Sequence, residues 1–245
     1  MIAYLTSHIG GSYKKNGSRV ATQLSTENGL LDRLQKRWKD NSKVLIISAD
    51  PDDIEINDSI LNIFAAAFPM SGLSVGQMDI CDNRNEKLVD EITRYDVIIL
   101  SGGHVPTQNR FFERIRLKEY IRKFDGILIG ISAGTMNSAD VVYAQPELEG
   151  ESIDKGYERF LSGLGITELM VLPHYQDIKD NILDGKRLFE DITYPDSFDR
   201  EFYALEDGSY LVIENQTATL FGTAYLIKDG DIKQICEKDK CICIA

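Results

Sequence analysis

Long hydrophobic runs are absent from this chain of 245 residues. No apolar stretch approaches the roughly 20 residues that a helix needs to cross a bilayer. The N-terminal segment MIAYLTSHIGG also lacks the basic region and the long apolar region of a secretory signal peptide. These absences predict a cytoplasmic protein that has no membrane partner.

Positive charge is scarce. The sequence has 27 Lys and Arg residues against 39 Asp and Glu residues, which gives a formal net charge of −12. This balance argues against a general nucleic-acid binder, because such proteins carry a basic surface. It does not restrict the substrate, since a local basic pocket can lie in an acidic protein. We therefore expect no nucleic-acid partner.

Cysteine is also rare, with four residues in the chain. Cys236, Cys241 and Cys243 form a C-x4-C-x-C pattern near the C-terminus. Structural zinc sites usually pair two C-x2-4-C units, so this spacing gives little support to a metal or redox site. The pattern favours an apolar terminal strand over residues 241–244 and predicts no metal.

What the sequence does contain is an alternation of strand-like and helical segments. Short connections between such segments indicate right-handed βαβ units and a parallel sheet with helices on both faces. The predicted fold is therefore α/β, with a doubly wound, mostly parallel, flavodoxin-like sheet. Strands are predicted at 2–7, 43–50, 73–81, 96–103 and 126–132, and helices at 30–38, 51–68, 85–95 and 110–124.

The remaining segments read differently. Residues 10–29 are rich in Gly, Ser, Asn and Thr and predict a loop, either a lid over the site or a plain surface loop. After residue 140, strands joined by tight turns predict C-terminal β-hairpins, with a turn at 228–231. No repeat or low-complexity linker interrupts the chain, so we expect one domain over 1–245. These later strands are predicted at 170–175, 201–207, 209–215 and 217–236.

The segment ILIGISAGTMNSAD, at 127–140, places Ser132 between two glycines at the end of an apolar strand. Residues 130–134, Gly-Ile-Ser-Ala-Gly, match G-x-S-x-G, the nucleophile elbow. In this motif a sharp strand-to-helix turn exposes the serine hydroxyl, and the amide of Ala133 can face a developing oxyanion. A simple Gly-Ser turn, or a phosphate-binding turn in a protein without catalysis, is the alternative interpretation.

A serine nucleophile needs a base, and the chain has three histidines. In a doubly wound sheet, functional groups collect at the carboxyl ends of strands. His104 follows two glycines after one predicted strand, and His174 ends another. His8 ends the first strand. For each of them a hydrogen-bonded structural role is the alternative.

Four segments together resemble peptidase family S51: LSGGHVPTQNRFF, GISAG, LPHY and ALEDGS, in this order and at these separations. The resemblance covers about residues 43–230. The family contains aspartyl dipeptidase (peptidase E) and cyanophycinase. It has a class I glutamine amidotransferase-like α/β fold, in which a serine replaces the amidotransferase cysteine. The resemblance implies a Ser-His-acid arrangement that needs no metal or organic cofactor.

Carried over by motif, the resemblance assigns the roles of five residues. Ser132 matches the nucleophile, His174 in PHY matches the general base, and Asp207 matches the acid. Gly103 matches the residue whose backbone amide completes the oxyanion hole with Ala133.

Two other acids are alternatives for the third member of the triad. Glu206 matches a proline of the family and is the weaker choice, and Asp177 lies three residues after His174. The amidotransferase signature would place an acid two residues after the histidine. Gln176 occupies that position, which argues against transfer of the glutamine amide nitrogen.

The chain departs from the family in its substrate-binding segments. The family has Gly-Gly-Asn-Thr where this chain has Gly-Gly-His-Val at 102–105, which argues against strict N-terminal aspartate specificity. Lys186 and Arg187 are the nearest cations to the family's basic segment, or they are solvated surface residues. The polar residues beside the motifs are candidates for the substrate site or for helix caps and loop contacts: His104, Gln108, Asn109 and Tyr175.

Together these features predict a serine peptidase that cleaves small peptides through an acyl-enzyme, with N-terminal Asp-X dipeptides as one candidate substrate. The alternatives are a non-hydrolytic binding module on the same fold and another serine hydrolase such as an esterase. A homodimer through the sheet edge or the C-terminal hairpins is compatible with the composition.

Overall fold

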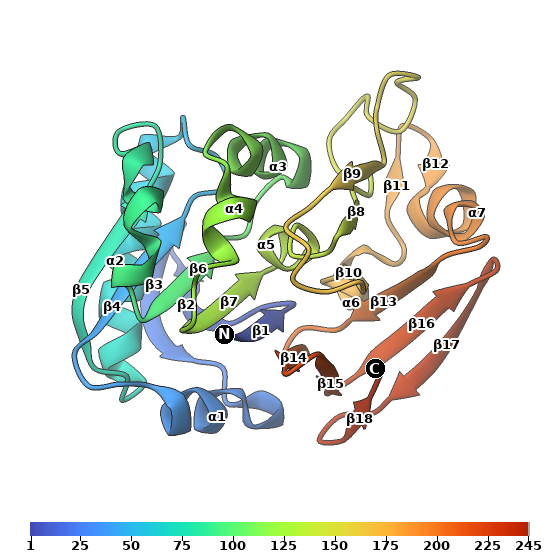
Figure 1. Ribbon diagram of the computed structural model, residues 1–245. Helices are drawn as coiled ribbons and strands as arrows, with labels where there is room; N and C mark the ends of the chain where they lie inside the picture. Colours follow the sequence, from blue (N-terminus) through green and yellow to red (C-terminus); the bar gives the residue numbers. More distant parts are fainter. Residues whose placement is uncertain (245) are drawn as a thin grey trace.

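The computed structural model describes residues 1–244, and its centre is an eight-stranded sheet (Figure 1). Five neighbouring strands in the order β1-β7-β6-β4-β5 are parallel, and β14, β15 and β18 extend the β1 edge in antiparallel fashion. This is the mostly parallel sheet that the sequence predicts. The strands are β1 (Ile2–Thr6), β4 (Ser42–Ile47), β5 (Val75–Cys81), β6 (Val97–Leu100), β7 (Ile127–Ile131), β14 (Tyr210–Glu214), β15 (Thr217–Phe221) and β18 (Cys241–Cys243).

Helices cover both faces of this sheet because successive strand residues point to opposite sides. Val44 and Ile46 pack in one apolar cluster with α1 and α2, whereas Leu45 and Ile47 pack in another with η2, α3 and α4. Strands buried on both faces explain the nearly continuous apolar runs of the sequence. The elements are α1 (Leu30–Arg37), α2 (Ile54–Met70), the 3₁₀ helix η2 (Glu86–Arg94), α3 (Val105–Arg114) and α4 (Leu117–Ile121).

A second sheet of four strands lies beside the first, in the order β10-β13-β16-β17. Strands β10 and β13 are parallel, and the turn between β16 and β17 is the hairpin predicted at 228–231. The strands are β10 (Met170–Leu172), β13 (Glu201–Leu205), β16 (Ala224–Lys228) and β17 (Asp231–Cys236). Short elements border this sheet: α6 (Tyr175–Ile178), β11 (Ile182–Leu183), β12 (Lys186–Arg187), the π-helix η3 (Leu188–Thr193) and α7 (Tyr194–Asp196).

The prediction of a loop over residues 10–29 is wrong. This segment forms a hairpin of β2 (Gly10–Lys15) and β3 (Ser18–Leu24), followed by η1 (Glu27–Gly29). The hairpin packs on α2, where the backbone N–H of Leu24 donates to Ser71 Oγ at 2.8 Å. Its small polar residues suit an exposed two-stranded ribbon. Such a ribbon lacks the alternation of apolar and polar residues from which a strand is predicted.

Two predicted helices also differ in detail. Residues 110–124 form parts of α3 and α4, which are separated at Arg116, where the backbone is left-handed with φ 54°. Residues 85–95 contain the 3₁₀ helix η2 in place of an α-helix. No helix among residues 1–244 has the length and apolar character needed to cross a membrane.

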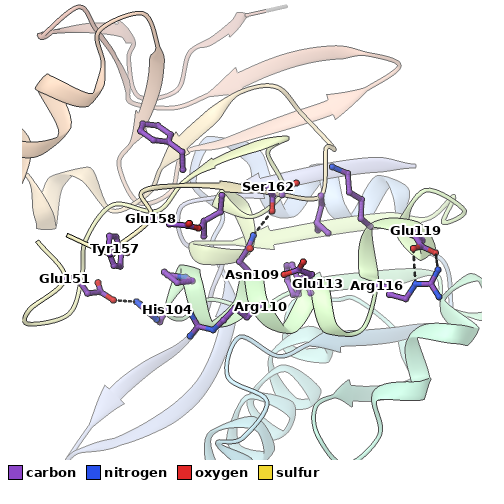
Figure 2. Close-up of a pocket in the computed structure, with 18 of the residues that line it drawn as sticks. His104, Asn109, Arg110, Glu113, Arg116, Glu119, Glu151, Tyr157, Glu158 and Ser162 are labelled. Carbon is purple, nitrogen blue, oxygen red and sulfur yellow. Dashed lines mark hydrogen bonds and ion pairs between the residues drawn. The ribbon is translucent and has the colours of Figure 1, made fainter. Parts of the chain in front are cut away.

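An excursion after α5 (Ala133–Met136) carries the chain from the first sheet to the second. It contains the paired strands β8 (Val141–Tyr143) and β9 (Phe160–Ser162). Between this excursion and helices α3 and α4 lies an open groove of about 950 Å³ (Figure 2). Its lining carries charged side chains of both signs, among them Arg110, Glu113 and Glu151.

Candidate active site

The candidate nucleophile lies where three neighbouring strands end. Strands β1, β7 and β6 are adjacent and parallel, so their carboxyl ends meet at one edge of the sheet. Ser7 follows β1, Ser132 follows β7 and Gly103 follows β6. The topology alone therefore brings these three residues together, although they are far apart in the sequence.

Ser132 has the strained backbone of a nucleophile elbow, with φ 49° and ψ −111°. A conformation that L-residues rarely adopt persists only where the surroundings enforce it, and such strain clusters at active sites. The flanking glycines explain how the turn fits. A Cβ atom at Gly134 would lie 2.2 Å from the carbonyl oxygen of Leu100, and one at Gly130 would lie 3.0 Å from Cα of Thr135.

The helix that follows the serine is a single turn, α5, which begins at Ala133. The backbone N–H of Met136 donates to the carbonyl of Ser132 at 3.0 Å and closes this turn. So short a helix has a small macrodipole, because the dipole grows with the number of aligned peptide units. Any stabilisation of an oxyanion here would therefore come from individual N–H groups, as in other oxyanion holes.

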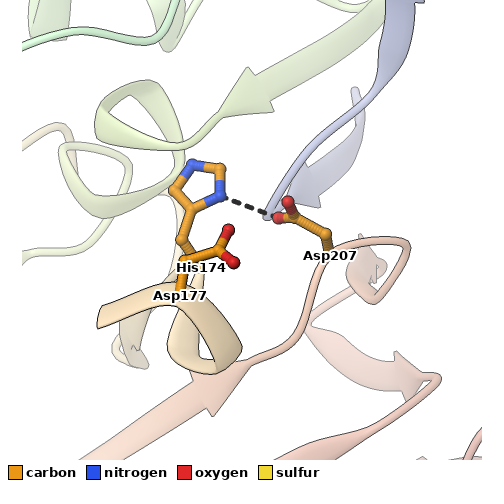
Figure 3. A group of neighbouring side chains, drawn as sticks. All are labelled: His174, Asp177 and Asp207. Atoms are coloured by element: carbon orange, nitrogen blue, oxygen red, sulfur yellow. Dashed lines mark hydrogen bonds and ion pairs between the residues drawn. The ribbon is translucent and has the colours of Figure 1, made fainter. Parts of the chain in front are cut away.

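His174 and Asp207 come from the second sheet and are joined by a hydrogen bond. His174 follows β10, Asp207 follows β13, and these two strands are parallel neighbours. The Nδ1 atom of His174 donates to Oδ1 of Asp207 at 2.7 Å (Figure 3). The left-handed backbone of His174, with φ 59°, turns the chain at this point. With Nδ1 donating, Nε2 is the ring nitrogen that can accept a proton.

Ser7 links His174 and Asp207 through hydrogen bonds. Its hydroxyl donates to Asp207 Oδ1 at 2.7 Å and accepts the backbone N–H of His174 at 2.8 Å. Burial alone would raise the pKa of Asp207, but hydrogen bonds from His174 and Ser7 outweigh it and hold that pKa below its usual value. The carboxylate is therefore ionised at neutral pH and can stabilise an imidazolium.

Two side chains of α6 complete this arrangement. Gln176 accepts the backbone N–H of Asp207 at 3.0 Å and donates to Asp177 at 2.9 Å. His174, Asp177 and Asp207 form the one group within residues 1–244 whose potential metal-ligand atoms lie within 4.8 Å of one another. Because Nδ1 of His174 already donates to Asp207, this group fits a catalytic hydrogen-bonded pair better than a metal centre. The C-terminal cysteines do not belong to it.

Ser132 and His174 line one cavity of about 170 Å³, together with Gly103. A Cβ atom at Gly103 would lie 2.6 Å from Cβ of Ala49, so this position requires glycine. No hydrogen bond within residues 1–244 joins the Ser132 hydroxyl to His174. In ligand-free enzymes this contact is often long and tightens when substrate binds.

All four candidate substrate-binding residues lie outside this cavity. His104 and Asn109 border the larger groove of Figure 2, where His104 Nε2 donates to Glu151 at 2.8 Å and Asn109 donates to Asn137 at 2.9 Å. Gln108 is fully buried and donates to the carbonyl of Ser101 at 2.7 Å. In this arrangement their contacts are structural.

The other candidates also have protein partners. Tyr175 packs against Tyr225 with ring centroids 4.7 Å apart, and burial raises its pKa to about 12. Glu206 accepts from the Tyr225 hydroxyl at 3.0 Å, whereas the carboxylate that is hydrogen-bonded to His174 is that of Asp207. Lys186 donates to the carbonyl of Ser152 and Arg187 pairs with Asp191, so neither cation lines the cavity.

Two residues of the site, Ser7 and Glu147, carry no sequence signal that predicts their place there. Ser7 lies in an ordinary TSH segment, and only the pairing of β1 with β7 and β14 places it beside Asp207. Glu147, from the excursion after β8, lines the cavity with Ser132. Neither residue belongs to a motif with a chemical signature, so their roles depend on tertiary structure.

Comparison with known proteins agrees with the fold and the motifs. The model of peptidase family S51 matches residues 18–221. No curated protein matches the chain. A solved structure of a peptidase from an acI-B1 Actinobacterium is similar with a TM-score of 0.66 and 16% identity, over 99% of this chain and 96% of that one.

A second solved structure, a peptidase E candidate from Listeria monocytogenes EGD-e, is similar with a TM-score of 0.58 and 14% identity. The match covers 96% of this chain and 98% of that one. Identities this low indicate a shared fold. Since the family model spans most of the chain and includes the elbow at Ser132, the protein belongs to peptidase family S51.

Proposed function

We propose that this protein is a serine peptidase that hydrolyses small peptides through Ser132, His174 and Asp207. The observation that carries the proposal is the strained elbow at Ser132, which shares a cavity with a histidine hydrogen-bonded to a carboxylate. Membership of a peptidase family supports the same reaction class.

The proposed mechanism follows from these positions. The Ser132 hydroxyl attacks the scissile carbonyl while Nε2 of His174 takes its proton. Asp207 holds the imidazole tautomer and stabilises the imidazolium. The amides of Gly103 and Ala133 bind the oxyanion, His174 protonates the leaving amine, and water then releases the acyl group from Ser132. Each oxyanion-hole donor typically contributes on the order of 10²–10³ in rate.

The finer expectation, cleavage of N-terminal Asp-X dipeptides, needs a cation for the substrate carboxylate. Within the part of the chain that the structure describes, no Lys or Arg lines the Ser132 cavity. We therefore propose a small-peptide exopeptidase whose preferred N-terminal residue is not acidic.

The test is hydrolysis of a dipeptide panel by wild type and Ser132→Ala in parallel, with Asp-X, Glu-X, Asn-X and neutral N-terminal residues. We expect cleavage of neutral dipeptides by wild type and its loss in Ser132→Ala. Equal hydrolysis by both proteins would refute the assignment of the nucleophile. Cleavage of Asp-X alone would refute the proposed preference and keep the mechanism.

A second candidate is a non-hydrolytic binding module on the same fold. The missing hydrogen bond between Ser132 and His174 and the Gly-Gly-His-Val segment at 102–105 favour it. A fluorophosphonate, which reacts only with an activated serine, separates the two functions. Labelling of Ser132 that is lost in His174→Ala would exclude the inert module.

A further inference from the structure

The cavity that contains Ser132 is apolar on most of its wall. Side chains from several elements form this wall: Val105, Met136, Leu172, Ile178, Leu183 and Leu188. Its volume, about 170 Å³, is close to that of an apolar protein cavity of ~150 Å³ that holds one benzene molecule. The space therefore suits one apolar side chain of a substrate and is too small for an extended peptide.

Among residues 1–244, Glu147 is the one acidic residue that lines this cavity, and no Lys or Arg lines it. Glu147 therefore shares the cavity with both Ser132 and His174. The residue is exposed at the cavity mouth, yet withdrawal from water raises the pKa of its carboxyl group. A carboxylate in such a position is stabilised by a cation brought in with the substrate.

The backbone that carries Glu147 is held firmly. One oxygen of Glu151 accepts the N–H groups of Glu147 and Leu148, each at 2.9 Å. The other oxygen accepts from His104 Nε2 at 2.8 Å, as Figure 2 shows. His104 directly follows Gly103, the proposed oxyanion-hole residue. The Glu151 carboxylate therefore fixes Glu147 relative to the point where the scissile carbonyl would bind.

The segment that carries Glu147 is also hydrogen-bonded to the turn after β11. Asp184, in the turn after Leu183, accepts the N–H groups of Gly150 and Ser152 at 2.9 and 3.1 Å. Since Leu183 lines the cavity, these hydrogen bonds connect the segment that carries Glu147 to the apolar wall. Hydrogen bonds on both sides therefore hold the backbone segment that carries Glu147 in place beside the cavity.

We propose that Glu147 binds the free α-amino group of the substrate, and that the enzyme removes an apolar N-terminal residue from short peptides. This inference rests on the proposed peptidase function. In such a substrate the ammonium group and the scissile carbonyl are attached to the same Cα atom. A carboxylate in the cavity of the nucleophile can therefore reach the amine while Ser132 reaches the carbonyl. The apolar wall takes the side chain.

The test uses dipeptides and pentapeptides that begin with Leu, Met, Asp or Lys, each with a free or an N-acetylated amine. We expect wild type to cleave the free Leu and Met peptides, with kcat/KM at least about 30-fold above that for their acetylated forms. An acetylated substrate would cover the Glu147 carboxylate without supplying a cation to pair with it, which is costly. Glu147→Gln should lose about 30-fold or more on the free peptides and nearly nothing on the acetylated ones.

Glu149→Gln is the matched control, because Glu149 is exposed on the same segment and does not line the cavity. Its kcat/KM should equal that of wild type. Fluorophosphonate labelling of Ser132 should be as complete in Glu147→Gln as in wild type, which shows that the nucleophile remains intact.

Three results would overturn the inference alone, with Ser132 still labelled: equal cleavage of free and acetylated peptides, a preference for Asp or Lys, or an unchanged rate in Glu147→Gln. Absence of hydrolysis of every peptide, with Ser132 labelled, would also overturn it. Absence of both labelling and hydrolysis would refute the proposed function itself, and the inference with it.

Discussion

At the scale of single residues, the pair of His174 and Asp207 determines which nitrogen of the imidazole can act as base. Asp207→Asn keeps the shape of the side chain but can stabilise the wrong tautomer. We expect kcat to fall on the order of 10⁴-fold, the loss seen when a triad carboxylate becomes an amide. Steady-state hydrolysis of the best peptide substrate measures this change.

Glu206→Gln is the control for that experiment. Glu206 is adjacent in sequence but accepts from Tyr225, so its replacement should leave kcat within a few-fold of wild type. If Glu206→Gln were the variant with the large loss, Glu206 would be the third member of the triad and our reading of the contacts would be wrong.

The effect of replacing Ser7 on stability is expected to depend on pH. Hydrogen bonds from His174 and Ser7 hold the pKa of Asp207 below its usual value, against the effect of burial. A carboxyl group with a depressed folded-state pKa stabilises the native state above its usual pKa, and that stabilisation is lost as pH falls through the folded pKa. Ser7→Ala removes part of this effect.

We therefore expect wild type to unfold at higher urea concentration than Ser7→Ala at neutral pH. The part of this difference that depends on Asp207 should vanish as pH falls below the usual range of aspartate. Urea unfolding at a series of pH values measures it. In the Asp207→Asn background, Ser7→Ala should show no such pH dependence, and a difference that is the same at every pH would contradict the argument.

At the scale of elements, the turn from β7 to α5 depends on close backbone approach. A Cβ atom at Gly134 would lie 2.2 Å from the Leu100 carbonyl oxygen, which cannot move without disturbing β6. We expect Gly134→Ala to lower the free energy of unfolding by about 1–3 kcal/mol, the usual cost of overpacking, and to reduce kcat by displacing Ser132.

Gly156→Ala is the corresponding control. A Cβ atom there would meet nothing closer than 3.4 Å, and the position lies on the exposed excursion between β8 and β9. Its unfolding midpoint in urea should match that of wild type. Equal destabilisation by both substitutions would show that the close approach at Gly134 has no special cost.

The elements themselves were predictable to different degrees. Apolar runs such as 43–50 and 126–132 have no other stable environment than a covered sheet, so β4 and β7 were confirmed near their predicted bounds. The hairpin over 10–24 was missed because its strands are exposed and its pairing is set by tertiary packing on α2. The break at Arg116 carries no Gly or Pro and leaves no signal in the sequence.

The site was predictable wherever a motif specified the backbone. G-x-S-x-G predicted the elbow at Ser132, and the resemblance to peptidase family S51 pointed to His174 and Asp207, which follow β10 and β13. Ser7 and Glu147 were not predictable, because each reaches the site through the pairing of distant strands or through a side-chain contact across the excursion. Such contacts cannot be predicted from the local sequence.

At the scale of the whole molecule, the site lies where two sheets meet. The first sheet supplies Ser132 and Gly103 at the ends of β7 and β6, and the second supplies His174 and Asp207 at the ends of β10 and β13. Ser7, at the end of β1, is hydrogen-bonded to both His174 and Asp207. The mutual position of the two sheets therefore sets the distance between Ser132 and His174.

This architecture predicts a reaction that needs no metal. His174 donates through Nδ1 to Asp207, and the proposed mechanism needs its Nε2 for proton transfer, so neither nitrogen would be available to a metal ion during catalysis. Prolonged dialysis against EDTA should leave kcat unchanged. Loss of activity that added Zn²⁺ restores would show that the group of His174, Asp177 and Asp207 is a metal centre.

The most direct test of the whole account is labelling by a fluorophosphonate, followed by peptide mass spectrometry. We predict stoichiometric modification of Ser132 in wild type and its loss in both Ser132→Ala and His174→Ala. An unmodified Ser132 in folded wild-type protein, or undiminished labelling in His174→Ala, would contradict the claim that these two residues form a nucleophile and its base.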